Sequence, residues 1–157
     1  MPSSTLPLPR AVLPHGEAFL FVDEILTLGE RDITARRRVP LEEPWTAAHF
    51  PGGPIVPGVL LLEGMAQTCG ILARRGSAES LPRAPGFLAS IRSARFHHSV
   101  TPGASLIYKA ELLARAGGLR QFRASVHSAD RLIAEAELCL ALGDNTGGAS
   151  SEEPRSP

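Results

Sequence analysis

The stretch that decides the fold is AHFPGGPIVPGVLLLEGMAQ, residues 48–67. It passes from a loop rich in proline and glycine into a run that is almost wholly apolar, interrupted by Glu63. Good helix formers follow Pro57, and proline is tolerated at a helix start because its missing N–H would have no partner there. We therefore expect a helix over residues 58–75 that is apolar, and so buried, on nearly every side.

Short β patterns lie on both sides of this expected helix. They cover residues 19–28, 32–40, 87–96, 105–116, 119–129 and 132–142. Glycine-containing or other short turns separate most of them, which is typical of antiparallel pairing, and the last four are expected to form a meander. The sequence thus predicts an α+β fold in which a long antiparallel sheet wraps one central helix.

Length and composition indicate one globular domain. The chain has 157 residues, of which 43% are hydrophobic and 20% are charged. Residues 1–12 and 143–157 are rich in small residues and proline, so we expect a flexible N-terminal segment, a folded domain over 13–142 and a disordered C-terminal tail. Basic and acidic residues are equal at 16 each, which argues against nucleic-acid binding through an overall basic surface.

Cysteine usage and hydropathy favour an intracellular setting. Cys69 and Cys139 lie far apart and outside any metal-ligand pattern, so we expect buried thiols in a reducing compartment and no metal site. The first residues contain no apolar core of signal-peptide length, and no apolar run is long enough to span a bilayer. A soluble cytoplasmic protein is the expectation.

Glu63 is the unusual residue of the predicted helix. Desolvation disfavours a charged carboxylate, so an apolar neighbourhood would favour a form that holds a proton and can donate it to a leaving group. The alternative is that Glu63 faces a wet groove or pairs with an arginine. Gly64 and Gly70 each cost about 1 kcal/mol relative to alanine inside a helix, which predicts close approach of another backbone.

Two further groups near the helix start can act with such an acid. His49, in the rigid loop before the helix, can supply a neutral imidazole as a base, although a purely structural histidine remains the alternative. The N–H groups around Gly58 and Val59 lack intrahelical partners and can hold negative charge on a thioester carbonyl. Base, N–H donor and acid together suit elimination of water from a β-hydroxyacyl compound.

It stays open whether one chain brings these groups together. His49 and Glu63 are 14 positions apart, across a loop and part of a helix. Pairing of two protomers, with each site built from His49 of one and Glu63 of the other, is a second arrangement.

Long motifs carry a resemblance to a known family. HFPGGPIVPGVLLLEGMAQ (49–67) strongly resembles the signature of the FabZ-type β-hydroxyacyl-acyl carrier protein dehydratases. LPHGEAFLFVDEI (13–25), FLASIRSARFHHSVTPGASL (87–106) and AEAELCLAL (134–142) resemble the opening, a strand–turn segment and the final strand of that family. The resemblance covers nearly all of 13–142.

The resemblance implies a hotdog fold, a dimer with active sites at its interface, and commonly three such dimers together. It implies that His49 is catalytic, that Glu63 of the opposite protomer is the acid, and that the Gly58 N–H holds the thioester carbonyl. Phe50 and Val59 are expected beside the substrate. It implies no cofactor and no metal, since the (3R)-hydroxyacyl group arrives on the phosphopantetheine arm of an acyl carrier protein and leaves as a trans-2-enoyl group.

Departures from the family pattern concern the carrier. The chain differs in charge from the family pattern, and is mostly less basic, at four positions: Glu24, His97, His98 and Ala104. The identity of the carrier therefore stays open. Arg95 is a candidate for holding the acidic carrier or phosphopantetheine, with a plain surface arginine as the alternative. A hotdog acyl thioesterase and a non-catalytic acyl- or carrier-binding module are the rival functions. Chain-length preference also stays open and is expected to depend on Phe87 and on residues 76–86.

Overall fold

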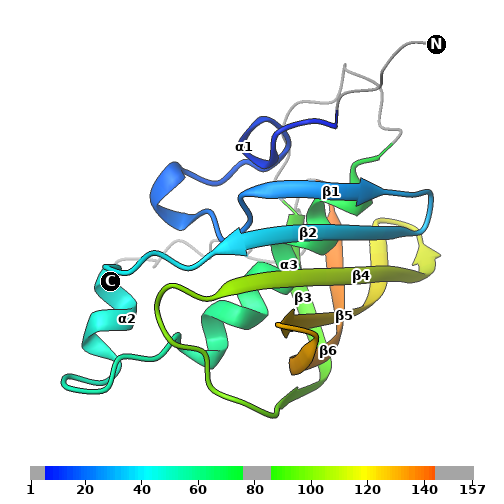
Figure 1. Cartoon of the computed structure of the whole chain (residues 1–157). Helices are drawn as coiled ribbons and strands as arrows, with labels where there is room; N and C mark the ends of the chain where they lie inside the picture. Colours follow the sequence, from blue (N-terminus) through cyan, green and yellow to red (C-terminus); the bar gives the residue numbers. More distant parts are fainter. Residues whose placement is uncertain (1–5, 76–85, 144–157) are drawn as a thin grey trace, which may run out of the picture.

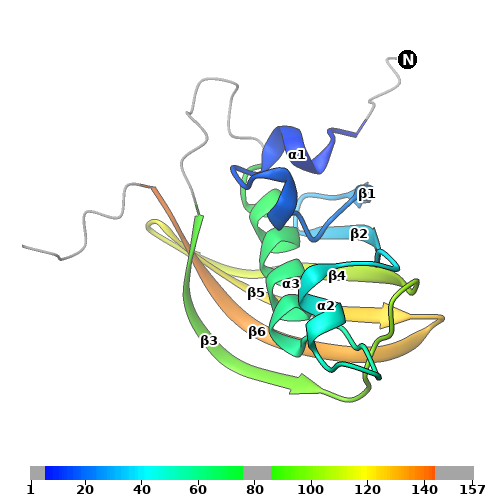
Figure 2. The same cartoon turned by 90° about the vertical axis from the view of Figure 1, so that its left-hand side faces the viewer.

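A computed structural model describes residues 6–75 and 86–143 (Figure 1). One six-stranded antiparallel sheet curves around a single long helix, which confirms the predicted α+β architecture. The strands are β1 (Glu24–Leu28), β2 (Asp32–Arg38), β3 (Gly86–Phe96), β4 (Ser105–Ala116), β5 (Leu119–Ser128) and β6 (Arg131–Leu142). The helices are α1 (Pro9–Val12), α2 (Pro44–Ala48) and the central α3 (Gly58–Ala73), which lies inside the curve of the sheet (Figure 2).

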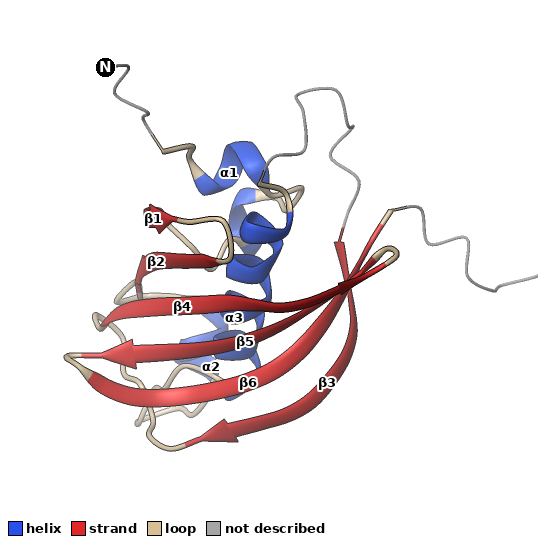
Figure 3. Ribbon diagram, turned by 90° about the vertical axis from the view of Figure 1, so that its right-hand side faces the viewer, coloured by secondary structure: helices blue, strands red, loops and turns tan. Residues whose placement is uncertain are grey.

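The strand order is β1-β2-β4-β5-β6-β3. The expected meander is therefore correct for β4, β5 and β6 but wrong for β3, which pairs with β6 at the far edge of the sheet (Figure 3). Tight turns join β4 to β5 and β5 to β6, whereas residues 97–104 form a longer connection between β3 and β4. That connection is anchored where Val56 N–H donates to the Val100 carbonyl at 2.8 Å.

The first predicted strand is shorter than expected. Residues 19–28 were expected to be extended throughout, but Glu17–Phe19 form a 3-10 turn and β1 begins only at Glu24. The physical reason is a competing partner, because the Phe21 N–H donates to the side-chain Oε1 of Gln67 on α3 at 2.9 Å rather than to a neighbouring strand. The segment before β1 is thus tied to the central helix.

Helix α3 is buried along most of its length but not at its start. Residues 64–72 are buried, whereas Val59 in the first turn is 69% exposed, so the expectation of burial on nearly every side fails there. Gly64 packs directly against the hydroxyl of Tyr108 on β4, with no room for a Cβ. The close approach predicted at this glycine is therefore made by a side chain and not by a backbone, while a Cβ at Gly70 would meet only ordinary contacts at 3.5 Å or more.

The predicted domain boundaries stay a prediction, since residues 1–5 and 144–157 lie outside the described residues. Within the first twelve residues, Pro9–Val12 form one helical turn, α1, with Pro9 buried. Cys69 is buried and Cys139 is half-buried, and both are free thiols. Burial raises the pKa of the Cys69 thiol far above its usual range.

Candidate active site

Glu63 lies in the second turn of α3 and lines a pocket of about 160 Å³ together with His15, Gln67 and Phe87. Its side chain is 24% exposed. Gln67 Nε2 donates to Glu63 Oε1 at 2.9 Å, and His15 Nε2 lies 3.4 Å from the same oxygen. Of the two alternatives for Glu63, the structure is nearer to the wet groove than to a fully apolar neighbourhood, because a partly open pocket and two polar side chains face the carboxylate. Phe87, expected to influence chain length, does line this pocket, whereas residues 76–85 lie outside the described residues.

Gln67 is held in a single orientation. Its Oε1 accepts the Phe21 N–H at 2.9 Å, and its Nε2 donates both to the Phe19 carbonyl at 2.8 Å and to Glu63. These contacts use both amide hydrogens and the amide oxygen. Rotating the amide by 180° would bring its NH₂ group to the Phe21 N–H and its oxygen to the oxygens of Phe19 and Glu63, so all three hydrogen bonds would be lost. Gln67 therefore links Glu63 rigidly to the segment that precedes β1.

His49 caps the C-terminal end of α2 and starts the loop that leads to α3. Its N–H donates to the Thr46 carbonyl at 3.1 Å, and its carbonyl accepts the Ile55 N–H at 2.9 Å. Between them the chain makes a tight turn in which Gly52 has a φ of 84°, a conformation that favours glycine. The imidazole stacks on Phe50, with ring centroids 4.2 Å apart, and its Nδ1 is buried without a hydrogen-bond partner in the described part of the chain.

The start of α3 presents its N–H groups beside apolar side chains. Gly58 is the first helical residue, and a Cβ there would lie 3.1 Å from the ring of Phe96 on β3. Val59 is 69% exposed and Phe50 is 58% exposed. The expected substrate-binding residues therefore lie on the surface of a single protomer, and Val59 is one helical turn before Glu63 on the same side of α3.

Arg95 is also exposed, on β3, where it stands opposite Glu135 of β6. Directly after β3, His97 Nε2 lies 3.2 Å from Oε1 of the same Glu135. The Arg95 side chain is thus accessible to a partner from solvent, but its contact with a carrier or phosphopantetheine stays a prediction.

The structure brings Glu63 together with His15 and Gln67, and not with His49. Within residues 6–75 and 86–143, no hydrogen bond or ion pair joins His49 to Glu63, and His49 does not line the pocket that contains Glu63. Sequence reasoning missed His15 and Gln67. The signals were present, because His15 stands in the LPHG motif and Gln67 follows Glu63 by one helical turn, a spacing at which side chains meet.

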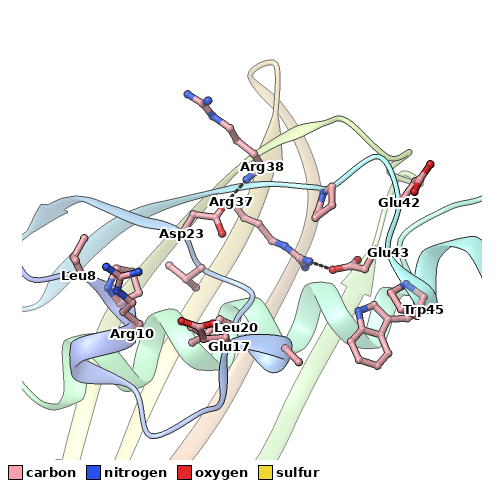
Figure 4. Close-up of a pocket in the computed structure, with 15 residues that line it drawn as sticks. Leu8, Arg10, Glu17, Leu20, Asp23, Arg37, Arg38, Glu42, Glu43 and Trp45 are labelled. Carbon is pink, nitrogen blue, oxygen red and sulfur yellow. Dashed lines mark hydrogen bonds and ion pairs between the residues drawn. The ribbon is translucent and has the colours of Figure 1, made fainter.

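A buried ion pair supports the loop that carries His49 (Figure 4). Arg37, at the end of β2, pairs with Glu43, just before α2, and Thr46 Oγ1 donates to the other carboxylate oxygen of Glu43 at 2.9 Å. The Arg37 guanidinium also lies 4.4 Å from the centroid of the Phe21 ring, and both residues of the ion pair line a pocket of about 620 Å³. Burial raises the pKa of nearby Tyr108 above its usual range, and the charge of Arg37 opposes this only in part.

The described residues contain no group of three or more His, Cys, Asp or Glu side chains arranged to hold a metal ion. Among the helices of this same part of the chain, none has the length and apolar character needed to cross a membrane.

Comparison with known proteins places the chain in a family. Residues 13–137 match the model of the FabA-like domain. The chain is 43% identical over 136 residues to the 3-hydroxyacyl-[acyl-carrier-protein] dehydratase FabZ of Thiobacillus denitrificans, covering 84% of this chain and 92% of that protein. It is 39% identical over 131 residues to the FabZ of Syntrophobacter fumaroxidans, covering 83% of this chain and 88% of that protein.

Among solved structures, the dehydratase heterocomplex ApeI:P from Xenorhabdus doucetiae matches with a TM-score of 0.76 over 90% of this chain and 95% of that chain. At 17% sequence identity this likeness concerns the fold alone, and it confirms the expected hotdog architecture. Together with the family model and the sequence relatives, it establishes that this chain belongs to the FabA-like family, among the FabZ-type 3-hydroxyacyl-[acyl-carrier-protein] dehydratases.

Proposed function

We propose that the chain eliminates water from a (3R)-3-hydroxyacyl group carried on acyl carrier protein and gives the trans-2-enoyl thioester. The observation that carries this proposal is the 43% identity to a dehydratase over 136 residues, in a chain where Glu63 lines a pocket on the central helix. The reaction belongs to fatty-acid or related acyl-chain biosynthesis. The cytoplasmic location expected from the sequence stays a prediction.

The chemistry needs three groups. His49 removes the proton from C2, and the electron pair of that C–H bond moves into the thioester, where the Gly58 N–H stabilises the enolate oxygen. The pair then returns to form the C2=C3 double bond, the C3–O bond breaks, and the hydroxyl leaves as water with the proton of Glu63. The water released carries the Glu63 proton away. His49 then gives the C2 proton to solvent and Glu63 takes a proton from solvent, which restores both groups for the next turnover.

Two protomers complete each site in this proposal. Support comes from the separation of the groups in one chain, where Glu63 contacts His15 and Gln67 and not His49. Support also comes from β3, an edge strand whose residues 87–96 are all exposed and include Phe87, Leu88 and Ile91. An edge with unpaired backbone groups and apolar side chains favours pairing with a second strand. Pairing of β3 with β3 of a second copy would cover the apolar surface, and three such dimers would form the expected hexamer.

The carrier is expected to approach the same surface. The family resemblance implies an acidic carrier protein. Arg95 on β3 offers an exposed positive charge that an acidic surface would attract. Phe50 and Val59 would contact the acyl group or its pantetheine arm, and their exposure and apolar character support this role.

The test is an assay with a (3R)-3-hydroxyacyl-acyl carrier protein, following formation of the enoyl thioester. The variants His49→Ala and Glu63→Gln are each expected to lower kcat about 10²- to 10⁴-fold, the usual contribution of a general acid or base. Undiminished turnover in either variant would contradict the assignment. Release of free thiol without enoyl formation would instead identify a thioesterase, and tight carrier binding without turnover a binding module.

Mixing the two inactive variants tests the shared site. In a two-fold dimer of one His49→Ala chain and one Glu63→Gln chain, one site keeps both native groups and the other lacks both. Random exchange of subunits should therefore restore about one quarter of wild-type activity, because about half the dimers are mixed and each has one intact site. If both groups act within one chain, the mixture would stay inactive.

A further inference from the structure

Side-chain nitrogen atoms of two residues lie close to the same carboxyl oxygen of Glu63, Oε1. Gln67 Nε2 donates to Oε1 at 2.9 Å, and His15 Nε2 lies 3.4 Å from that oxygen. In the described residues, Oε2 has no hydrogen-bond partner, and the carboxyl group borders the pocket of about 160 Å³. The two oxygens of this carboxyl group therefore stand in different surroundings.

His15 is held in place by its own segment. Leu13, two residues earlier, is buried in the core, and the imidazole stacks on Phe19 with ring centroids 6.3 Å apart and planes 19° apart. Its Nδ1 is buried without a hydrogen-bond partner among the described residues. A neutral imidazole carries its proton on one nitrogen only, and a proton on Nε2 can be donated to the carboxylate, whereas a proton on Nδ1 would be buried without an acceptor. The surroundings thus favour the tautomer with the proton on Nε2.

The consequence concerns where Glu63 carries its proton. A carboxylic acid carries one proton on one of its two oxygens. With N–H groups from Gln67 and His15 both beside Oε1, a proton on that oxygen would face other donors, so the proton belongs on Oε2. We propose that His15 is a positioning residue that acts with Gln67 to direct the transferable proton of Glu63 to Oε2, the oxygen that has no hydrogen-bond partner among the described residues. This inference rests on the proposed role of Glu63 as the acid.

A matched pair of substitutions separates positioning from packing. His15→Phe keeps an aromatic ring to stack on Phe19 but removes the donor, whereas His15→Gln loses the ring and keeps an N–H donor at similar reach. If His15 positions the proton, His15→Phe should lower kcat about 10- to 100-fold with little change in KM, because the lost interaction matters in the transition state. His15→Gln should retain kcat within about threefold. His15→Leu, a second variant without a donor, should repeat the loss.

The opposite ranking would overturn the inference. If His15 only packs, His15→Phe would keep wild-type kcat, and His15→Gln would lose activity together with thermal stability. Thermal unfolding and oligomeric state are therefore measured for each variant alongside the assay.

A double-mutant cycle with Glu63→Gln separates this inference from the proposed function. Because His15 acts through Glu63, His15→Phe should cost no further activity when Glu63 is already replaced by glutamine. Additive losses in the double variant would overturn the positioning role while leaving Glu63 as the acid. Full turnover of Glu63→Gln alone would instead overturn the proposed function itself.

Discussion

The two edges of the sheet differ in length, charge and exposure. β1 has five residues, is interrupted between Ile25 and Thr27 by an irregular register, and carries the exposed ion pair between Glu24 and Arg36 of β2. β3 has eleven residues and, although its register with β6 is irregular at two places and it carries Arg92 and Arg95, it is exposed along residues 87–96 with several large apolar side chains. A short edge without exposed large apolar side chains offers little to another chain, whereas a long edge with such side chains favours pairing.

This difference indicates how the chain can associate. Two pairing edges on one chain would allow strands to add at both ends, which leads to open assemblies. One pairing edge allows a closed, two-fold dimer, because the same surface is used on both copies. In the proposed dimer, the sheet would therefore meet one partner through β3 and leave β1 unpaired.

The largest expected effect comes from placing a charge on the long edge. Ile91→Asp on β3 should convert dimers into monomers and lower dehydratase activity at least about 100-fold, because each site would lose the group supplied by the other chain. Size-exclusion chromatography with light scattering measures the first effect and enoyl formation the second. Thr27→Asp on β1 is the matched control and should change neither. A fully active monomer would refute the comparison.

The second largest effect is expected at the buried ion pair between Arg37, on β2 next to β1, and Glu43. Arg37→Met should lower the free energy of unfolding by about 3–5 kcal/mol, because it leaves the Glu43 carboxylate buried without its partner. In the wild type that carboxylate is only 11% exposed. Urea unfolding gives the value, and a loss below about 1 kcal/mol would show that the pair behaves like a surface ion pair.

A smaller loss is expected at the helix–sheet contact. Gly64→Ala should destabilise the fold by about 1–3 kcal/mol, because the new methyl group meets the Tyr108 hydroxyl and the core must shift. Adding Tyr108→Phe should recover part of that loss, since it removes the atom nearest to the new methyl group. Thermal unfolding of the two single variants and the double variant measures this recovery, and strictly additive losses would argue against direct contact.

The smallest effect belongs to the short edge. Glu24→Gln should change the free energy of unfolding by about 1 kcal/mol or less, because its ion pair with Arg36 is largely exposed and screened by water and salt. Repeating the urea titration in high salt should shrink even this difference. A change as large as that of Arg37→Met would mean that β1 depends on its exposed charges.

Local patterns predicted most elements but not their neighbours. Helix formers after Pro57 predicted α3, and alternating runs predicted β2 to β6 within a few residues. The position of β3 beside β6 could not be read from its own residues, because it depends on where the long connection from β3 crosses the sheet. The shortened β1 could not be predicted either, since the Phe21 N–H donates its hydrogen bond to the side chain of Gln67, 46 positions away.

The candidate site shows the same division. His49, Gly58 and Glu63 could be selected because they share one continuous motif. The LPHG motif marks His15, but its contact with Glu63 could not be predicted, because the two residues lie in separate motifs and meet only through tertiary packing. The expected cross-chain pairing of His49 with Glu63 concerns a second copy and stays a prediction.

Gln67 connects the Glu63 carboxyl group to the backbone of the segment before β1. Because one amide group joins the Glu63 carboxylate to the Phe21 N–H, a change in the charge of that carboxylate alters the polarisation of the whole hydrogen-bonded chain. The Phe21 amide resonance is therefore expected to respond to the charge of Glu63 in the protein without substrate. In Gln67→Leu this response of the Phe21 amide should be lost.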